Sequence, residues 1–421
     1  MDVGKAQAEF VLVALLLGVG IGLRLPAVAF LALPLAVHLL GGFVLASADR
    51  PPRLQATRTV SASRVWEGET VEVTVEVANR GRRVELLHVR DPVPRGVEVL
   101  EGGGEVLADL APGAALTLAY TARVRRGVYE LPSVRVQARD FLGYVGWSAE
   151  VPCPAGLTVL PRYERLGGIT LSPRRTLPQA GTARSRRGGA GVEFFGAREY
   201  RPGDEIRRIN WKATARTGEL VVTEYEEERA ADVVVVLDVR AAAYRGVDPL
   251  ELLDHSARGA ATVVQGLLAQ GNRVGLLLYG AYLDWVYPGY GRRHGERLLR
   301  QIARARPGHS EVFAELRNIP TRLLAPGSQV VVVSPLLPGD EEDLGALVAR
   351  GYRVLVLVPD VTTMEREHLG TGPEVEMAAR ILALERWALV GRLYAARVRP
   401  LLWDVRYPLA PQARAAWRRL W

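Results

Sequence analysis

The sequence predicts a multidomain chain with an N-terminal transmembrane helix hairpin, an all-β sandwich domain, and an α/β domain with a mostly parallel sheet. Three observations indicate this fold class. Two long apolar runs open the chain, period-two alternation follows from about residue 57, and continuous apolar strands alternate with helical segments from residue 232. A length of 421 residues suggests two to three domains, and 48% hydrophobic residues suffice for buried cores.

The two apolar runs predict the membrane hairpin, assigned to residues 1–50. Residues 10–23 are apolar without interruption, Arg24 breaks the run, and residues 25–48 continue it with His38 as the one strongly polar interruption. A spanning helix needs about 20 apolar residues, so the second run qualifies while the first is short. A cleaved signal peptide is the rival interpretation, because Lys5 followed by a short apolar stretch resembles one.

The orientation of the hairpin follows from its positive flanks. Lys5 precedes the first run, and Arg50, Arg53 and Arg58 follow the second. The positive-inside rule places both flanks in the cytoplasm. We therefore expect a multi-pass cell-membrane protein that contacts the lipid bilayer through residues 10–48, with its soluble domains in the cytoplasm.

Residues 51–162 are predicted to form the β-sandwich domain. Valines at 71, 73, 75 and 77 alternate with glutamate and threonine, which is the pattern of a half-buried strand. Further short strands follow at similar intervals, separated by turns rich in glycine and proline, as in a sandwich. Nothing in this domain indicates chemistry.

Residues 163–231 are predicted to comprise a basic linker and a distinctive signature segment. Five arginines of the linker lie among glycine, proline and serine: Arg174, Arg175, Arg184, Arg186 and Arg187. Such a stretch can bind phosphate groups or anionic lipid, but it is more often a solvated loop. Nucleic acid is not expected as a partner, and binding of an anionic polymer or lipid by this 174–187 arm is kept as an alternative function.

Residues 232–421 are predicted to form the α/β domain. The run 233–237 is continuously apolar and β-branched, which is typical of a strand buried on both faces, and residues 250–269 follow as a helix. Further strands and helices alternate to the C-terminus, which indicates a parallel sheet covered on both sides. Ligands of such sheets bind at the carboxyl ends of the strands, so Asp238, Tyr279 and Ser334 are expected at that edge.

Common catalytic signatures are absent from the sequence. Lys5 and Lys212 are its only lysines and neither lies in a P-loop, and Cys153 is its only cysteine. No HExxH or G-x-S-x-G motif occurs. We therefore predict a protein that is not an enzyme and has no cofactor, with catalysis in an unrecognised cleft between the β and α/β domains kept as an alternative.

The segment 191–228, GVEFFGAREYRPGDEIRRINWKATARTGELVVTEYEEE, resembles the signature of the domain-of-unknown-function-58 family. The surroundings are similar too: the strand at Arg126–Tyr129 matches the end of the family's β domain, and Trp403-Asp404 and Pro408-Leu409 match its end. The resemblance implies a von Willebrand factor A-like (Rossmann-like) α/β domain. It also implies a MoxR-type AAA+ ATPase as partner, since the two are commonly encoded together.

We therefore expect a non-enzymatic, membrane-anchored adaptor that works with this ATPase in chaperone-like maturation or assembly of client proteins. The signature is expected to serve either as an interdomain latch or as a docking surface. Pro202-Gly203 predicts a turn with Asp204 as N-cap of a helix over 206–214, which Ile206 and Trp211 would pack on the neighbouring sheet. The candidate residues are Glu193, Arg198, Tyr200, Asp204, Arg207, Asn210, Trp211 and Lys212.

The resemblance also raises the question of a metal. Von Willebrand A domains that bind Mg²⁺ end their first strand in DxSxS, which supplies hard oxygen ligands. Here the strand ends in Asp238-Val239-Arg240-Ala241-Ala242, so Arg240 and Ala242 replace both serines. We predict a degenerate site without metal, in which Asp238 and Arg240 form an ion pair.

Overall fold

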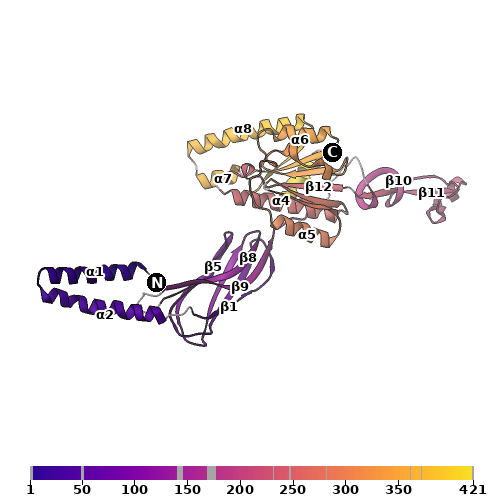
Figure 1. Ribbon diagram of the computed structural model, residues 1–421. Helices are drawn as coiled ribbons and strands as arrows, with labels where there is room; N and C mark the ends of the chain where they lie inside the picture. Colours follow the sequence, from indigo (N-terminus) through magenta and orange to yellow (C-terminus); the bar gives the residue numbers. More distant parts are fainter. Residues whose placement is uncertain are drawn as a thin grey trace. The chain divides into compact units, whose positions relative to one another are not determined.

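The computed structural model describes residues 3–48, 52–139, 146–167, 177–230, 232–245, 248–280, 282–360, 362–370 and 372–419. The chain divides into two compact units, Met1–Val159 and Leu160–Trp421 (Figure 1). The finer predicted division, at residues 50, 162 and 231, stays a prediction.

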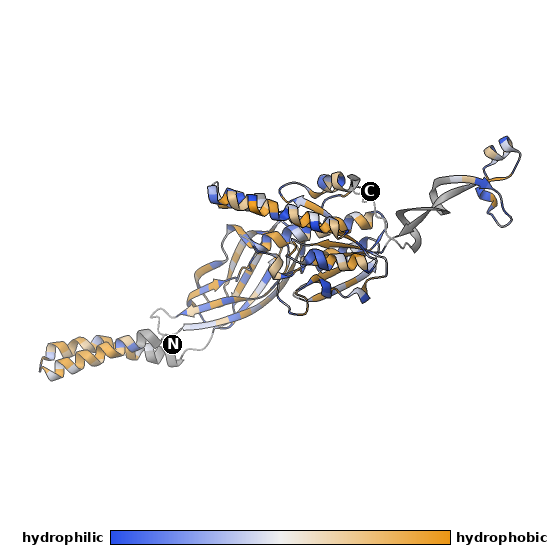
Figure 2. Ribbon diagram, turned by 90° about the horizontal axis from the view of Figure 1, so that it is seen from above, coloured by the Kyte–Doolittle hydropathy of each residue, from blue (hydrophilic) through white to orange (hydrophobic). Residues whose placement is uncertain are grey.

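Two helices open the first unit, α1 (Val3–Gly22) and α2 (Pro26–Ala48), and they lie side by side. Arg24 turns the chain between them in the left-handed region, with φ 54°. Both helices are largely hydrophobic in Figure 2. A polar contact joins them, between His38 Nδ1 and Glu9 Oε2 at 3.2 Å.

Among the described residues, no helix combines the length and the apolar character that crossing a membrane requires. The predicted transmembrane hairpin is therefore wrong, and with it the bilayer contact through residues 10–48 and the multi-pass localisation. Counting apolar residues in the sequence did not anticipate the contact between Glu9 and His38, which places two polar side chains within the apolar length. It also passed over Pro34, which removes a backbone donor in the middle of α2.

The rest of the first unit consists of two antiparallel sheets. One has the order β1-β3-β7-β5 and the other β2-β9-β8-β4-β6. Their strands are β1 (Leu54–Val60), β2 (Arg64–Trp66), β3 (Thr70–Asn79), β4 (Val84–Arg90), β5 (Val97–Gly102), β6 (Glu105–Leu110), β7 (Ala115–Val124), β8 (Gly127–Arg139) and β9 (Gly146–Leu160). The alternating valines of β3 are buried with Leu87 and Val89 of β4 in one core, so both sheets contribute to it.

A buried arginine connects the two sheets of this unit. The Arg58 guanidinium, on β1, binds the Asp91 carboxylate and donates to the backbone oxygens of Ser133 and Cys153, each at 3.0 Å. Neither charged side chain is exposed, and Tyr120 Oη donates to the second Asp91 oxygen at 2.9 Å. Because β8 and β9 belong to the other sheet, this one side chain satisfies polar groups on both.

The second unit contains a six-stranded sheet of order β14-β13-β12-β15-β16-β17. The strands are β12 (Asp232–Asp238), β13 (Arg273–Tyr279), β14 (Leu283–Gly289), β15 (Gln329–Val333), β16 (Arg353–Asp360) and β17 (Arg399–Asp404). All neighbours pair in parallel except the edge strand β14, which runs antiparallel to β13. The fold class is thus corrected to two N-terminal apolar helices followed by several sheets that mix parallel and antiparallel pairing.

Helices cover both faces of this sheet. In Figure 1, α4 (Pro249–Ala269) and α5 (Arg292–Ala303) lie on one side, and α6 (Asp340–Ala349) and α8 (Pro373–Ala395) on the other. Leu344 of α6 and Leu393 of α8 are buried with alternate residues of the strands. The same domain also contains α7 (Thr362–Leu369), α9 (Leu409–Arg419) and the 3₁₀ turns η2 (Ala241–Ala243), η3 (Leu316–Asn318) and η4 (Thr321–Leu323).

In the sequence, a two-stranded antiparallel sheet precedes the six-stranded one, formed by β10 (Leu177–Glu199) and β11 (Val221–Ala230). A basic stretch rich in glycine is typical of a solvated loop, and a loop is predicted over much of this range. The backbone instead pairs with β11, with several register shifts. The side chains of 177–195 and residues 168–176 lie outside the description, so the predicted arginine arm is not described.

We expect Asp91→Asn to lower the free energy of unfolding by about 3–5 kcal/mol, because it leaves the buried Arg58 guanidinium without its counter-charge. Urea denaturation followed by circular dichroism measures this change. Asp109→Asn is the matched control, since Asp109 pairs with Arg83 on the surface and should change stability far less. Equal effects of the two substitutions would contradict the importance of the buried pair.

Candidate functional site

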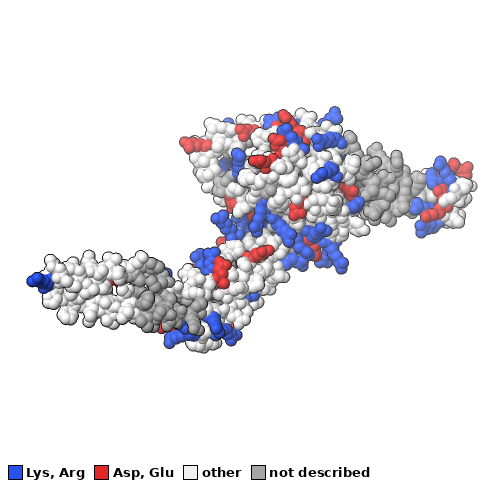
Figure 3. All heavy atoms as spheres, in the orientation of Figure 1, with Lys and Arg blue, Asp and Glu red and all other residues white. Residues whose placement is uncertain are grey.

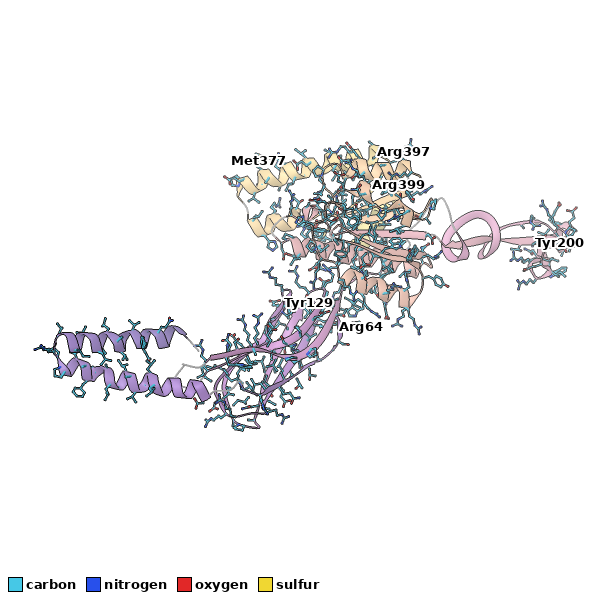
Figure 4. The ribbon with its side chains drawn as sticks, viewed as in Figure 1. Arg64, Tyr129, Tyr200, Met377, Arg397 and Arg399 are labelled. Atoms are coloured by element: carbon cyan, nitrogen blue, oxygen red, sulfur yellow. The ribbon has the colours of Figure 1, made fainter. Side chains whose placement is uncertain are left out.

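The signature segment forms the tip of the β10–β11 hairpin. The last pair of the ladder joins Glu199 to Val221, and the intervening residues fold back on it. Tyr200 N donates to Leu220 O at 2.8 Å, and Asn210 N donates to Val221 O at 2.7 Å. Figure 4 shows Tyr200 at this far end of the hairpin. The tip is therefore an ordered structure built on the strand ends.

A bidentate ion pair organises the tip. Arg198 Nη1 and Nη2 donate to the two Asp204 carboxylate oxygens at 2.7 and 2.8 Å. Gly203, with φ 106°, makes the turn that brings Asp204 back, and Arg201 N donates to Asp204 Oδ2 at 2.7 Å. The hydrogen bonds from Arg198 and from the Arg201 backbone lower the pKa of Asp204 to about 2. Planar guanidinium and carboxylate groups suit this geometry.

The predicted cap at Asp204 is wrong. The helix of the tip is α3 (Trp211–Thr217), and Asn210 caps it by accepting from Ala213 N at 3.1 Å. Glu205, which follows Asp204, is extended, so only the 3₁₀ turn η1 (Ile206–Arg208) forms there. Asp204 instead uses its side chain to hold Arg198 and the turn.

The predicted packing of Ile206 and Trp211 is also wrong, because their side chains point to solvent. Trp211 is 63% exposed and Ile206 is 70% exposed. Arg207 Nε binds Glu205 Oε2 at 2.7 Å, and Lys212 is exposed on α3. Figure 3 shows basic and acidic side chains interspersed over the tip. The side chain of Glu193 lies outside the described residues.

The second candidate region is buried at the carboxyl end of β12. Arg240 Nη2 binds Asp238 Oδ2 at 2.8 Å and Asp340 Oδ2 at 2.7 Å, while its Nη1 binds Asp340 Oδ1 at 3.0 Å. Arg240 Nη1 also donates to Ala314 O at 3.0 Å. Ser334 Oγ, at the end of β15, donates to Asp238 Oδ2 at 2.6 Å. The predicted pair of Asp238 and Arg240 is thus present and is extended by Asp340.

All four side chains of this cluster are buried. Burial opposes the charged form of Arg240, but hydrogen bonds to Asp340 and Asp238 outweigh it, so the pKa of Arg240 is raised. Burial also raises the pKa of Asp340, against the hydrogen bond from Arg240. One guanidinium neutralises two buried carboxylates, so the stability of the cluster depends on the positive charge of Arg240.

The backbone around Arg240 leaves little space. Gly280, with φ 147°, follows β13, and a Cβ there would lie 2.3 Å from Arg240 N. Ala242 lies half-buried in η2, whose first residue donates its N to Gly308 O at 2.9 Å. Within the described ranges, no group of three histidine, cysteine or acidic side chains is arranged to hold a metal. Where a cation would sit between Asp238 and Asp340, the guanidinium already donates to both.

Sequence reasoning missed Asp340, which lies about a hundred residues beyond Arg240. A signal for it exists, because the tetrapeptide Pro-Gly-Asp-Glu occurs twice, at 202–205 and at 338–341. In both copies the glycine has a positive φ, and the aspartate accepts from the backbone N three residues earlier, at 2.7 Å. In both copies, too, the aspartate binds an arginine with both oxygens. The repeat marks a preformed arginine-binding turn.

We expect the Asp204 carboxyl group to titrate near pH 2, and Arg198→Met to shift that midpoint upward toward the ordinary 3.8. Since the folded pKa is lowered, ionised Asp204 stabilises the tip above pH 3.8, and this contribution is lost as the pH falls through 2. Carboxyl ¹³C NMR of aspartate-labelled protein measures the midpoint. Arg207→Met is the control, because Arg207 pairs with Glu205 and not with Asp204. An Asp204 midpoint that is the same in the wild type and in Arg198→Met would contradict the ion pair.

Comparisons with known proteins find one family model and several related sequences. The family model described as protein of unknown function DUF58 matches residues 196–374. The Bacillus subtilis protein YeaD is 26% identical over 65% of this chain and 67% of its own length. The Mycobacterium tuberculosis protein Rv1480 is 34% identical over 27% of this chain and 37% of its own length.

Among solved structures, the CARDB domain of PF1109 from Pyrococcus furiosus covers 26% of this chain and 93% of its own, at 16% identity and a TM-score of 0.19. A similarity of that size carries no weight for this fold. The family match begins inside the β10 strand and includes the whole tip and the Arg240 cluster. The resemblance seen in the signature is thereby confirmed, and residues 196–374 form a region that belongs to the DUF58 family.

Proposed function

We propose that this protein is a non-catalytic adaptor whose hairpin tip docks a partner protein, with a MoxR-type AAA+ ATPase as the partner that the family resemblance implies. Its role would be chaperone-like maturation or assembly of client proteins. The observation that carries the proposal is the solvent exposure of Ile206 and Trp211 on a tip held in shape by the Arg198–Asp204 pair.

An interdomain latch would bury its apolar side chains, whereas a docking surface leaves them exposed until the partner binds. Tryptophan and arginine are the side chains most often found at the energetic centre of protein interfaces. The tip offers both, and its internal ion pairs reduce the entropy lost when it is bound. These features favour docking over the latch.

A catalytic role is less well supported at the same place. Lys212 is the one amine in the signature, and it is exposed on α3. A nucleophilic lysine needs an environment that lowers its pKa, usually a desolvated pocket or a neighbouring cation. Lys212 is exposed and not enclosed in a pocket, so the residue is better suited to charge recognition.

We further propose that the second unit is a von Willebrand factor A-like domain in which Arg240 takes the electrostatic role of the divalent cation. The Asp238 carboxylate, the Ser334 hydroxyl and the Asp340 carboxylate converge on its guanidinium. These groups are oxygen ligands of the kind that Mg²⁺ uses. A fixed side-chain cation would make the domain's conformation independent of metal supply.

We expect Mg²⁺ to leave the melting temperature of the wild-type protein unchanged, because the guanidinium occupies the space between the carboxylates. Arg240→Ser should lower stability by about 3–5 kcal/mol in chelator, since two buried carboxylates lose their counter-charge. Millimolar Mg²⁺ or Mn²⁺ should then restore part of it. Differential scanning calorimetry with and without the ions checks this, and Mg²⁺-dependent stabilisation of the wild type would refute the proposed role of Arg240.

We expect Trp211→Ala and Ile206→Ala to weaken binding to a purified MoxR-type ATPase from the same organism by tenfold or more, about 1.4 kcal/mol each. Their exposure predicts nearly unchanged melting temperatures. Biolayer interferometry with ATP, with ADP and without nucleotide measures the affinity. Tyr287→Ala is the matched control, because Tyr287 is an exposed aromatic residue on β14, outside the tip.

Two results would count against docking by the tip. If the wild-type protein does not bind the ATPase in any nucleotide state, the ATPase is not its partner. Tip variants that lose melting temperature in proportion to affinity would indicate a structural latch instead.

A further inference from the structure

Helix α8 has apolar side chains on two opposite faces. One face packs on the domain, where Leu393 is buried, Leu389 borders the same core, and Arg386 Nη1 lies 3.5 Å from Asp360 Oδ1. The residues on this face are three or four positions apart, as expected for one side of a helix.

The opposite face of α8 is apolar and open to solvent. Met377, Ile381 and Leu384 follow one another at intervals of four and three residues and are 59%, 50% and 72% exposed. Ala388 continues the line, and Trp387 beside it is 80% exposed. Figure 4 shows Met377 near the end of α8 that extends past the sheet. We call Met377, Ile381, Leu384 and Ala388 the outer stripe.

A helix that is hydrophobic on all sides is normally buried on all sides. Several large exposed apolar residues on one short surface mark an interaction site rather than ordinary surface composition. The intervals of four and three residues are those of a coiled-coil seam, in which each side chain fits between residues of a facing helix. The outer stripe is therefore suited to another helix.

We propose that the outer stripe pairs with the same stripe of a second copy of this chain, with the two helices antiparallel. In the register that places Ile381 of one copy level with Leu384 of the other, Met377 is level with Ala388. Large residues then face small ones at both ends of the seam, and two branched residues meet at its centre. Such alternation of size is what close packing between helices requires.

The flanks of the stripe fit the same register. Glu374 of one copy lies within one residue of the level of Arg392 of the other, on the same side of the seam, so opposite charges meet. Arg392 binds Glu341 through its Nε but keeps half of its side chain exposed. On the other side, Arg380 lies within two residues of the level of Trp387, where a guanidinium can stack on the indole. Each contact occurs twice in a symmetric pair.

A lipid surface is the competing occupant of such a stripe. Helices that lie on membranes carry lysine and arginine along the border of the apolar face. The border of the outer stripe carries three acidic residues and two basic ones: Glu374, Glu376, Glu385, Arg380 and Arg392. Its net charge is therefore negative, and anionic lipid would repel it. The charges therefore favour a second copy.

Disulfide trapping tests the register directly, because Cys153 is buried and is the only native cysteine. Full-length Ile381→Cys and Leu384→Cys proteins are oxidised separately and as an equimolar mixture. Antiparallel pairing predicts at least about threefold more cross-linked dimer in the mixture than in either protein alone. Equal or stronger cross-linking of each single variant with itself would overturn the antiparallel register.

The oligomeric state gives an independent test in the wild-type background. We expect a dimer in sedimentation equilibrium and a dissociation constant raised at least about tenfold by Leu384→Glu, because the carboxylate would be buried at the seam. Ala383→Glu is the matched control, since it adds the same charge one residue away, off the stripe. A monomeric wild type, or a dimer that Leu384→Glu leaves intact, overturns the proposal. A wild-type monomer that binds phosphatidylcholine–phosphatidylglycerol vesicles, with binding lost in Leu384→Glu, would assign the stripe to lipid.

Discussion

The second unit depends on one buried cation, the guanidinium of Arg240. It joins the end of β12, through Asp238, to the start of α6, through Asp340. Ser334, at the end of β15, donates to the Asp238 carboxylate. These segments are far apart in sequence and meet only because the parallel strands end at one edge of the sheet. Two buried carboxylates at this edge would repel each other without a positive charge between them. The arginine thus holds these three segments together.

The same turn supports both candidate regions, in different surroundings. Pro-Gly-Asp-Glu at 338–341 presents Asp340 to a buried arginine, and its copy at 202–205 presents Asp204 to a partly exposed one. In the interior the pair becomes part of the packing, so losing one partner is costly. At the hairpin tip water screens the pair, and its contribution is mainly to hold the loop in one shape. The same Pro-Gly-Asp-Glu turn therefore stabilises the interior at one place and fixes the shape of an exposed loop at the other.

Much of the second unit was readable from the sequence, because a run such as 233–237 has few alternatives to a buried strand and residues 250–269 are helical in the structure as expected. The ion pair of Asp238 and Arg240 was readable because its members are two residues apart. Asp340 was not, since only the sheet topology brings it there. The packing of Ile206 and Trp211 was predicted wrongly because apolar residues were assumed to be buried. The helix hairpin was wrongly predicted to cross a membrane because its apolar length was counted without its internal polar contacts. The long strand β10 was missed because backbone pairing with β11 overrides its glycine-rich composition.

The position of Lys212 has a practical consequence for chemistry on this protein. With 52 of the 54 basic residues being arginine, the chain offers very few primary amines, and Lys212 is an exposed one on α3. Lys5 is the only other lysine of the sequence. Labelling would therefore place a fluorophore on the hairpin tip itself, beside Trp211, whose emission it would quench by energy transfer. The tip carries its own spectroscopic reporter, without any cysteine having to be introduced.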